Sequence, residues 1–444
     1  MANSAAVSKI PLFRTLAARG YASQPAVAAA LKSGDVQTTT LPNKLVVSST
    51  ETGSAISRIS VAFKAGSRNE THDNLGAAHI IRVAAGLSTK HASTFGITRN
   101  VQQVGGSLSV TADRELLSYT IEVTRDNLET ALQYLEKSVT GQLFKPWEIA
   151  DSTPRVKLEL ANVSNQVRAV ELLHQAAYRT GLGNSLYCPD HKVGKISSET
   201  LQHFFESNFT ANRGAVSGVN IDHQMLLGYA QSLQLGSGEG AKNDNKYYGG
   251  ADVRCERGGK NASVAVATNG AGWSNLQEGI AFAVLQRAGG VGPATKWGQS
   301  AGVLVKAIQA AAPNTGATTL NASYSDNGLF GFVVSGPAKE AGIAVEAGIK
   351  TLKSCSPSDE DIARGKAQLK SELAFIYETD GSLVQELGVQ GIVYGNTLTL
   401  KGCFDAIDAV QAGDIKSAAR KLSNKVSIGA VGNLEHVPYA ADLN

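Results

Sequence analysis

Three residues between Asn74 and Gly86 have the spacing of a metal-binding helix. His79, Arg82 and Val83 stand at i, i+3 and i+4, so a helix places them on one face. An inverted zinc motif, H-x-x-E-H, carries two imidazoles and a general-base carboxylate at these positions. In this chain only the first imidazole is present, because an arginine replaces the carboxylate and a valine replaces the second imidazole.

The two replacements remove the chemistry of the motif. Arg82 carries a fixed positive charge, which cannot accept a proton from water and repels a divalent cation. Val83 has no lone pair to donate to a metal. Because a catalytic zinc site needs about three protein ligands around an open position, these positions predict a vestigial zinc motif, with no catalytic residue and no bound metal.

The elements around this motif alternate between strands and helices. Asn74 is predicted to cap the helix and Gly86 to end it. The β-branched alternation after Thr38 and from Ile59 predicts two strands, and a strand pair is expected around Asp113. Further helices are predicted from the spacing of apolar residues over 96–104, 125–140 and 146–181, the second with the stripe Leu128, Leu132, Leu135 and Val139.

Several longer segments carry a family resemblance. They are Lys64-Ala-Gly-Ser-Arg-Asn-Glu70, Leu75-Gly-Ala-Ala-His79, Gly105-Gly-Ser-Leu-Ser-Val-Thr-Ala-Asp113, Leu186-Tyr-Cys-Pro-Asp190 and Asn321-Ala-Ser-Tyr-Ser-Asp-Asn-Gly-Leu-Phe-Gly331. From about Val36 to its end the chain resembles the pitrilysin-type peptidases, which include the mitochondrial processing peptidase. The resemblance implies an α+β fold of two homologous domains, each a mixed, largely antiparallel sheet packed with helices.

The same resemblance implies a third zinc ligand, a glutamate on a downstream helix. Glu159, in Lys157-Leu-Glu-Leu-Ala, lies in the corresponding region, and Lys157 remains the alternative counterpart. From residue type alone, Glu159 is expected to be an exposed helix carboxylate, because charged residues are rarely buried unless they are paired.

An internal repeat indicates how the chain is divided. Leu108-Ser-Val-Thr, Leu117 and Ile121 match Leu320-Asn-Ala-Ser, Leu329 and Val333 at an offset of 212, and Ile196, Leu201, Ala215 and Gly218 match Val410, Ile415, Gly429 and Gly432 at 214. We therefore predict an N-terminal domain over 36–234 and a C-terminal domain over 248–444. The glycine-rich segment 235–247 between them is typical of an interdomain linker.

Composition excludes several classes of function. With 444 residues, 18% charged residues and a formal net charge of +3, the chain lacks the basic excess of a nucleic-acid-binding protein. Its four cysteines, Cys188, Cys255, Cys355 and Cys403, are widely spaced, so a disulfide or zinc role is not expected. No window reaches the ~18 consecutive apolar residues of a spanning helix, so membrane association is expected to occur through partners.

The first 34 residues contain Lys9, Arg14, Arg19 and Lys32 and no acidic residue. Such an amphipathic, acid-poor segment is typical of a mitochondrial transit peptide. Arg19-Gly-Tyr21 followed by Ala22 resembles a matrix processing site, so a transit peptide over 1–21 is predicted. A basic N-terminus without a targeting role is the alternative.

Within the family, the chain most resembles the non-catalytic core subunits of mitochondrial ubiquinol–cytochrome c reductase (complex III). This implies a structural and assembly role without a cofactor, peripheral on the matrix side of the inner membrane. The implied partners are a homologous core protein 1-like subunit and the cytochrome b, cytochrome c-type and Rieske iron-sulfur subunits. The alternative is the substrate-recognising subunit of a processing peptidase. The stretch Gly289 to Lys296 matches the place of that subunit's glycine-rich loop but is shorter, and it lacks the spacing of a phosphate-binding loop.

Overall fold

The computed structural model describes residues 35–240, 245–291, 302–354, 357–423 and 425–443. Arg19, Tyr21 and Ala22, the predicted processing site, lie outside these ranges. Most of the glycine-containing stretch 289–296 lies outside them as well. All statements below concern the described residues from position 35 onward, which form one compact unit.

The N-terminal half contains a mixed sheet that is mostly antiparallel. Its strands are β1 (Gln37–Thr40), β2 (Val46–Thr50), β3 (Ile56–Phe63), β4 (Ser107–Ala112), β5 (Leu117–Thr124) and β6 (Gly214–Val219), in the spatial order β1-β2-β6-β3-β5-β4. Within this sheet, β2 and β6 pair in parallel and the other described pairs are antiparallel. All residues of central β6 are buried, whereas edge strand β4 alternates between exposed and half-buried residues. This contrast follows from the two covered faces at the centre of the sheet.

The C-terminal half repeats this sheet. Its strands are β7 (Asp252–Glu256), β8 (Asn261–Asn269), β9 (Gly316–Ser323), β10 (Gly328–Pro337) and β11 (Ser427–Gly432), in the order β7-β11-β8-β10-β9, with β7 parallel to β11. Apart from β1, each strand occupies the place of its counterpart in the first half. Leu108 and its repeat partner Leu320 lie on β4 and β9, and Ala215 and Gly429 lie on β6 and β11. The predicted α+β fold and the sequence repeat are therefore confirmed.

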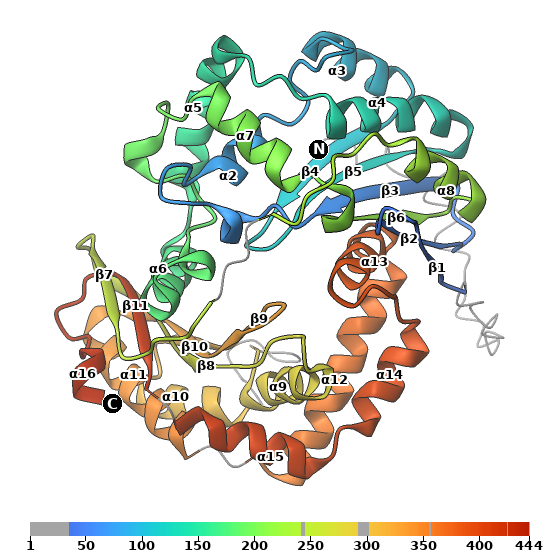
Figure 1. The fold of residues 1–444 in the computed structure, drawn as a ribbon. Helices are drawn as coiled ribbons and strands as arrows, with labels where there is room; N and C mark the ends of the chain where they lie inside the picture. The colour runs from blue at the N-terminus through green and yellow to red at the C-terminus, as the bar shows by residue number, and fades with distance from the viewer. Residues whose placement is uncertain (1–34, 241–244, 292–301, 355–356, 424, 444) are drawn as a thin grey trace, which may run out of the picture. The chain divides into compact units, whose positions relative to one another are not determined.

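Helices cover the sheets in both halves (Figure 1). In the first half they are α2 (Ala77–Val83), α3 (Thr94–Gln103), α4 (Leu128–Thr140), α5 (Pro146–Asn162), α6 (Asn165–Tyr178), α7 (Ser198–Asn208) and α8 (His223–Ser232). In the second half they are α9 (Leu276–Gly289), α10 (Val303–Ala311), α11 (Ala338–Lys353), α12 (Asp359–Glu378), α13 (Asp380–Tyr394), α14 (Leu400–Ala409), α15 (Ala412–Arg420) and α16 (Ala440–Leu443). The predicted apolar stripe of α4 is buried.

Two helix boundaries differ from the sequence prediction. The helix expected over 146–181 is two helices, because Val163 is extended and the Ser164 side chain caps α6 by accepting from Val167 N. Asn74 does not cap α2. Its side chain instead accepts a hydrogen bond from Thr71 N (2.7 Å), and α2 begins after Gly76, whose φ of 93° is accessible mainly to glycine.

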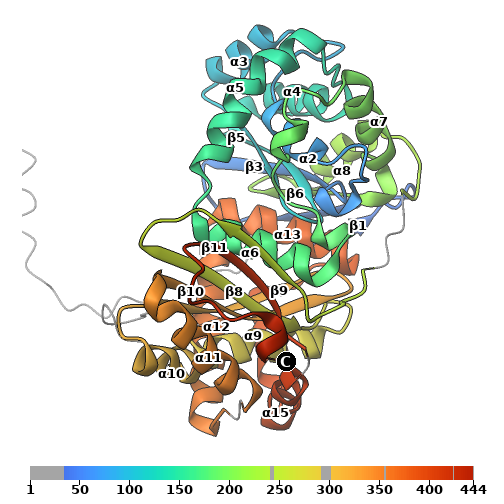
Figure 2. The same cartoon turned by 90° about the vertical axis from the view of Figure 1, so that its left-hand side faces the viewer.

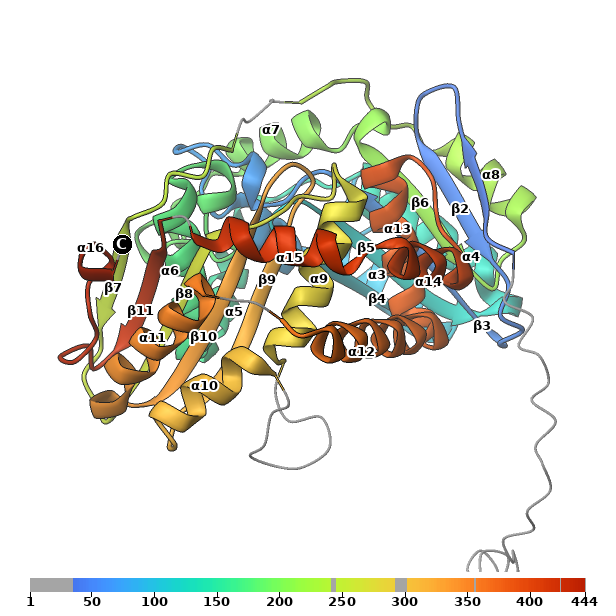
Figure 3. The ribbon, with the colours of Figure 1, turned by 90° about the horizontal axis from the view of Figure 1, so that it is seen from below.

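The two halves exchange a helix. Helix α6 of the first half packs on the C-terminal sheet, where Ala169, Leu173 and Ala177 share a buried cluster with Ala265 and Val431 (Figure 2). Helix α13 of the second half packs on the N-terminal sheet (Figure 3). Its buried side chains join two clusters there, one of Val46, Ala62, Leu116, Ala215 and Ile392 and one of Val219, Leu383, Val384 and Leu387. Since α6 and α13 occupy equivalent places in the repeat, each half completes the core of the other.

Polar contacts also connect the halves at the turns of two hairpins. Arg68 donates to Glu115 (2.5 Å) beside the β4–β5 turn and to both carboxylate oxygens of Asp326 at the β9–β10 turn. Ser325 N donates to Glu115 (2.9 Å) as well. The Arg68 and Glu115 side chains are mostly shielded from solvent, whereas Asp326 is exposed. Hydrogen bonds to charged groups are worth roughly 1.5–3 kcal/mol each. These contacts of Arg68, Glu115, Ser325 and Asp326, here called the Arg68 clasp, therefore stabilise the association of the two halves in addition to the apolar contacts of the exchanged helices.

The predicted linker, 235–247, connects two halves that are also joined by the exchanged helices. Residues at both ends of 235–247 make hydrogen bonds: Thr210 pairs with Gly236, and the Asn245 side chain accepts from Leu182 N (2.9 Å). Because α6 and α13 are exchanged, a cut in the linker would separate each sheet from one of its covering helices. The limits 36–234 and 248–444 thus remain a division of the sequence into repeats. Among the described residues, no helix combines the length and apolar character needed to cross a membrane.

A substitution at Gly429 tests the packing of α6 on the C-terminal sheet. A Cβ at this position would lie 2.3 Å from the Ala169 carbonyl oxygen and 2.3 Å from Leu173 N, both backbone atoms of α6. We expect Gly429→Ala to lower the free energy of unfolding by about 1–3 kcal/mol, because α6 must move off the sheet. Urea unfolding followed by circular dichroism measures the change. The matched control is Gly228→Ala on α8, where nothing lies within 4 Å; it should be neutral or stabilising, and an equal loss in both variants would contradict the close packing.

Candidate functional site

Helix α2, which carries the vestigial motif, is held at its N-terminus by a buried carboxylate. Glu70 accepts hydrogen bonds from Gly76 N and Ala78 N, both at 2.8 Å. These are two of the N–H groups that a helix leaves unpaired in its first turn. The Asn184 side chain donates to the Glu70 carbonyl (3.0 Å) and thereby attaches the loop before Cys188 to the same point.

The Glu70 carboxyl group has a strongly raised pKa. Burial raises its pKa to about 7, although the two backbone hydrogen bonds act in the opposite direction. A carboxyl group without solvent resists ionisation, and the N–H donors offset this cost only in part. The protonation state of the Glu70 carboxyl therefore changes near neutral pH. This carboxyl lies at the N-terminus of α2, the helix that carries His79.

The structure brings three of the predicted residues together. His79 Nε2 lies 3.1 Å from a carboxylate oxygen of Glu159 on α5, and Arg82 Nη2 donates to the same oxygen. Arg155, one turn before Glu159 on α5, contributes a longer contact of 3.4 Å to the other oxygen. Lys157 is exposed, so Glu159 and not Lys157 is the α5 residue that faces His79.

The hydrogen bonds of His79 fix its tautomer. Its Nδ1 accepts from Cys188 N at 3.1 Å, so in the neutral ring Nε2 carries the proton and donates to Glu159. Burial, followed by the charge of Arg82, lowers the pKa of His79 despite the hydrogen bond to Glu159, which acts to raise it. His79 is therefore neutral at physiological pH and has no lone pair free for a metal.

Glu159 is a charged, partnered carboxylate. Burial works against its ionisation, but the hydrogen bonds from His79 and Arg82 and the Arg82 charge prevail, so the pKa of Glu159 is lowered. The expectation of an exposed helix carboxylate is wrong, because only 26% of the side chain is accessible. The sequence could not show this, since its partners His79 and Arg82 on α2 lie far from Glu159 in the chain.

The donor set does not fit a zinc ion. Val83 is 3% exposed and packs in the N-terminal core. Arg82 occupies the side of Glu159 that faces α2, and its guanidinium supplies a positive charge that a metal would otherwise supply. In the part of the chain that the structure describes, no group of three or more His, Cys, Asp and Glu side chains could hold a metal.

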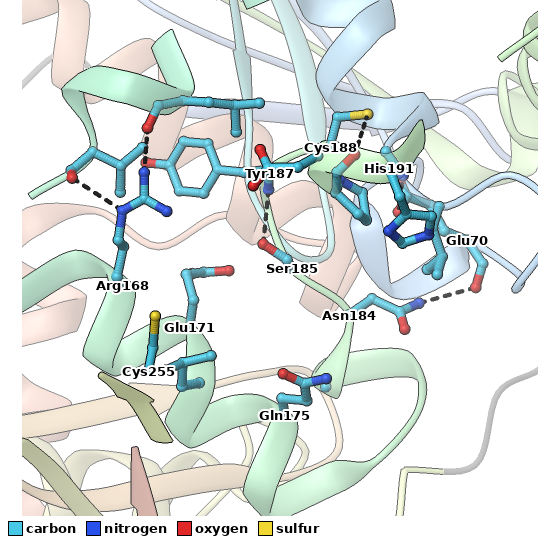
Figure 4. A pocket seen from close by; sticks show the side chains of 18 of the residues that line it. Glu70, Arg168, Glu171, Gln175, Asn184, Ser185, Tyr187, Cys188, His191 and Cys255 are labelled. Atoms are coloured by element: carbon cyan, nitrogen blue, oxygen red, sulfur yellow. Dashed lines mark hydrogen bonds between the residues drawn. The ribbon is translucent and has the colours of Figure 1, made fainter. Parts of the chain in front are cut away.

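Two cavities flank the cluster formed by His79, Arg82 and Glu159. One, of about 470 Å³, is lined by the cluster, by Tyr187 and by Val110 to Ala112 of edge strand β4. Tyr187 stands edge-on to His79, with ring centroids 5.7 Å apart. The other, of about 390 Å³, lies between α6, the loop 183–191 and the ends of β7 and β11 (Figure 4). Figure 4 shows Glu171, Gln175, Asn184, Ser185 and His191 around it.

Comparison with family models assigns the chain to a family. Residues 45–190 match the model described as insulinase (peptidase family M16), and residues 195–369 match the model described as peptidase M16 inactive domain. The chain belongs to peptidase family M16. The implied fold of two M16-type domains is confirmed.

Individual relatives extend this result. The chain is 37% identical over 418 residues to human cytochrome b-c1 complex subunit 2, mitochondrial, which covers 92% of each chain. It is 27% identical to the probable mitochondrial-processing peptidase subunit alpha-1 of Arabidopsis thaliana, covering 95% of this chain and 86% of that one. A chain in the structure of complex III2 from Candida albicans with Inz-5 bound has a TM-score of 0.78 at 20% identity, covering 92% of this chain and 99% of that one. At 20% identity, this structural similarity supports the fold alone.

Sequence reasoning missed several residues that shape the site. Glu70, Arg155, Tyr187 and Cys188 all contact α2 or Glu159 directly or through one hydrogen bond. Tyr187 and Cys188 lie within Leu186 to Asp190, a segment recognised only as part of the family resemblance. Their roles depend on a backbone N–H and on ring packing, and neither leaves a pattern in the sequence.

The raised pKa of Glu70 predicts a pH dependence of stability. A carboxyl pKa that rises from 4.5 to about 7 on folding contributes stability that is complete below the unfolded value and is lost as pH increases toward the folded value. Between about pH 4.5 and 7 this contribution should fall by up to ~1.4 kcal/mol per pH unit. We expect Glu70→Gln to flatten this part of the profile of unfolding free energy against pH. Glu360→Gln, at an exposed position of α12, should leave the profile unchanged; an unchanged slope in Glu70→Gln would contradict the assignment.

The unsuitable donor set predicts how zinc binding could be restored. The unmodified chain should retain no stoichiometric zinc after gel filtration, measured by inductively coupled plasma mass spectrometry. Arg82→Glu combined with Val83→His should retain about one zinc per chain, because Glu159 on α5 already faces His79 on α2. Arg82→Glu alone should remain metal-free and should be destabilised by like charges beside Glu159. Tightly held zinc in the unmodified chain would refute the argument.

Proposed function

We propose that this chain is a structural and assembly subunit of mitochondrial complex III, of the core protein 2 type. The identity to human cytochrome b-c1 complex subunit 2 over nearly the whole of both chains carries the proposal. Similar identity to the mouse protein of the same name supports it. The chain would support electron transfer from ubiquinol to cytochrome c without carrying a redox cofactor.

The site chemistry supports a non-catalytic role. A metallopeptidase of this kind needs a metal with an open position and a general base near the bound water. Here Arg82 takes the place of the base, and Val83 that of a ligand. The remaining carboxylate, Glu159, is paired with His79 and Arg82, so no group of the cluster is available to activate water.

The rigid connection between the halves also suits a supporting subunit. The exchanged helices and the Arg68 clasp connect the two halves at separate places. The proposed partners are a core protein 1-like subunit of the same family and the cytochrome b, cytochrome c-type and Rieske iron-sulfur subunits. The proposed location is the matrix face of the inner membrane, reached with a transit peptide over 1–21 and processed near Ala22.

A second candidate is the recognition subunit of a mitochondrial processing peptidase. The 27% identity to the probable alpha-1 subunit of Arabidopsis thaliana favours it, and a recognition role would not require a zinc site in this chain. That identity is ten percentage points lower than the 37% for the human cytochrome b-c1 subunit. The first candidate is therefore preferred.

Native electrophoresis of inner membranes distinguishes the two candidates. With a mild detergent, a tagged copy of the chain should migrate in one high-mass band with b-type and c-type haem, and its depletion should lower ubiquinol–cytochrome c reductase activity. Processing activity of a matrix extract toward a synthetic presequence should remain unchanged after depletion.

The opposite pattern would contradict the proposal. If the tagged chain occurs only in the soluble matrix and its depletion removes presequence processing, the chain is a peptidase subunit. A depleted strain that re-expresses the unmodified chain is the control for indirect loss of the membrane complex.

A further inference from the structure

Two aromatic side chains project from the surface of the N-terminal half. Phe95, at the start of α3, is 72% exposed, and Trp147, at the start of α5, is 62% exposed. Glu148, next to Trp147, accepts hydrogen bonds from Ser88 N (3.1 Å) and Ser88 Oγ (2.5 Å). The same Ser88 hydroxyl lies 3.3 Å from that of Thr94, next to Phe95. The two rings therefore belong to one surface, here called the aromatic patch.

The aromatic patch is not covered by the other half of the molecule. Helix α3 lies at the end of the N-terminal half that points away from the C-terminal half (Figure 1 and Figure 2). The loops on either side of the patch are fixed to each other, because Thr89 forms a β-bridge with Gln142 and Lys90 N donates to Gly141 O (2.8 Å). Large apolar side chains that remain exposed on such a rigid surface indicate a site of interaction.

Basic side chains surround the aromatic patch. Lys90 and Arg99 are exposed and have no carboxylate partner among the described residues. Arg99 follows Phe95 by one turn of α3, so the two share the exposed face of that helix. Lys145 Nζ lies 5.7 Å from the centre of the Trp147 ring. Each ring thus has a cation beside it.

Acidic residues near the patch do not cancel this charge. The sequence contains no acidic residue over 74–112. On α5, Glu148 is turned inward by its hydrogen bonds from Ser88, and its side chain is only 17% exposed. Asp151, one turn after Trp147, is exposed and offsets one of the three cations. The surface therefore combines exposed rings with an excess of positive charge.

We propose that the aromatic patch binds the surface of an anionic phospholipid bilayer. Indole rings favour the boundary between lipid and water, and lysine and arginine near that boundary are attracted to anionic headgroups. An acidic protein surface would match the cations, but the buried centre of a protein interface is depleted of charged residues. Cations standing among exposed rings suit a headgroup layer better, because the rings enter it while the charges stay at the level of the phosphates.

This inference rests on the proposed location at the inner membrane. It adds a direct contact with lipid to the association that occurs through partner subunits.

Vesicle co-sedimentation with the purified full-length chain tests the proposal. One set of vesicles is phosphatidylcholine alone, and the other contains about one third phosphatidylglycerol. We expect binding to the anionic vesicles that weakens with added salt, because the headgroup charge is screened. The basic residues among the first 34 positions also attract anionic lipid, so the comparison is made between variants that all carry this segment.

Charge variants test the position of the contact. Lys90→Gln combined with Lys145→Gln should weaken binding by about thirtyfold, since each cation near an anionic surface contributes roughly fivefold. The matched control is Lys306→Gln combined with Lys401→Gln, which removes two exposed lysines of α10 and α14. This control loses the same net charge and should bind as the unmodified chain does.

Aromatic variants test the rings themselves. Phe95→Ser combined with Trp147→Ser should weaken binding by about tenfold, because no ring enters the lipid interface. Phe375→Ser, which removes a ring that is 65% exposed on α12, should have no effect. Thermal unfolding of each variant confirms that it is folded.

Tryptophan fluorescence reports the contact directly. Trp273→Phe combined with Trp297→Phe leaves Trp147 as the one tryptophan of the chain. On binding to anionic vesicles its emission should shift to shorter wavelength, and brominated acyl chains should quench it, because the indole enters the interface.

Several results would overturn the proposal. Equal binding to both sets of vesicles excludes recognition of anionic lipid, and no binding to either leaves an acidic protein as the occupant. Unchanged Trp147 emission in the bound chain, or full binding by the folded Phe95→Ser and Trp147→Ser variant, places the lipid contact elsewhere.

Native electrophoresis separates this inference from the proposed function. Migration with b-type and c-type haem without vesicle binding refutes the lipid contact alone. Vesicle binding by a chain that does not migrate with haem refutes the complex III proposal alone.

Discussion

The exchange of α6 and α13 is the constraint on which the rest of this structure depends. Each sheet has a face that only a helix from the other half covers, and the apolar contacts involve residues with almost no solvent exposure, such as Leu173 and Leu387. Burying such side chains is worth about 1.5–3 kcal/mol each, so neither half has a complete core alone. The two repeats must therefore fold in contact. Helices α2 and α5 pack against each other within the first half, which fixes their relative position.

That fixed geometry determines the character of the vestigial site. Glu159 approaches His79 closely enough for a hydrogen bond, as it would if both held one metal. Two buried or partly buried polar groups at this distance need a compensating charge, because unpaired charges are costly away from water. Arg82 provides it, and the Cys188 N–H then fixes the His79 tautomer. The cluster is satisfied by its own side chains, which makes it a stable part of the core edge and not an incomplete active site.

A strand edge and a cavity lie beside the cluster of His79, Arg82 and Glu159. Strand β4 is at the edge of its sheet, and Arg82 is one of the residues that line the cavity. The cavity is lined by the Arg82 guanidinium at the position where the H-x-x-E-H motif has its carboxylate. A metal can polarise a carbonyl and activate water, whereas a guanidinium can only bind an anion.

The sequence by itself determined the fold class, the repeat and the residue types at the positions of the zinc motif. These depend on residue types and on their periodicity: strand alternation, matching offsets near 212 and 214, and an arginine and a valine where ligands are needed. Tertiary structure decided which helix covers which sheet, which residue of α5 faces His79, the tautomer of His79 and the raised pKa of Glu70. All four depend on contacts between segments distant in the chain or on burial, and a linear pattern records neither. The split between α5 and α6 was also missed, because the extended backbone of Val163 and the Ser164 cap interrupt a helix whose apolar spacing continues across them.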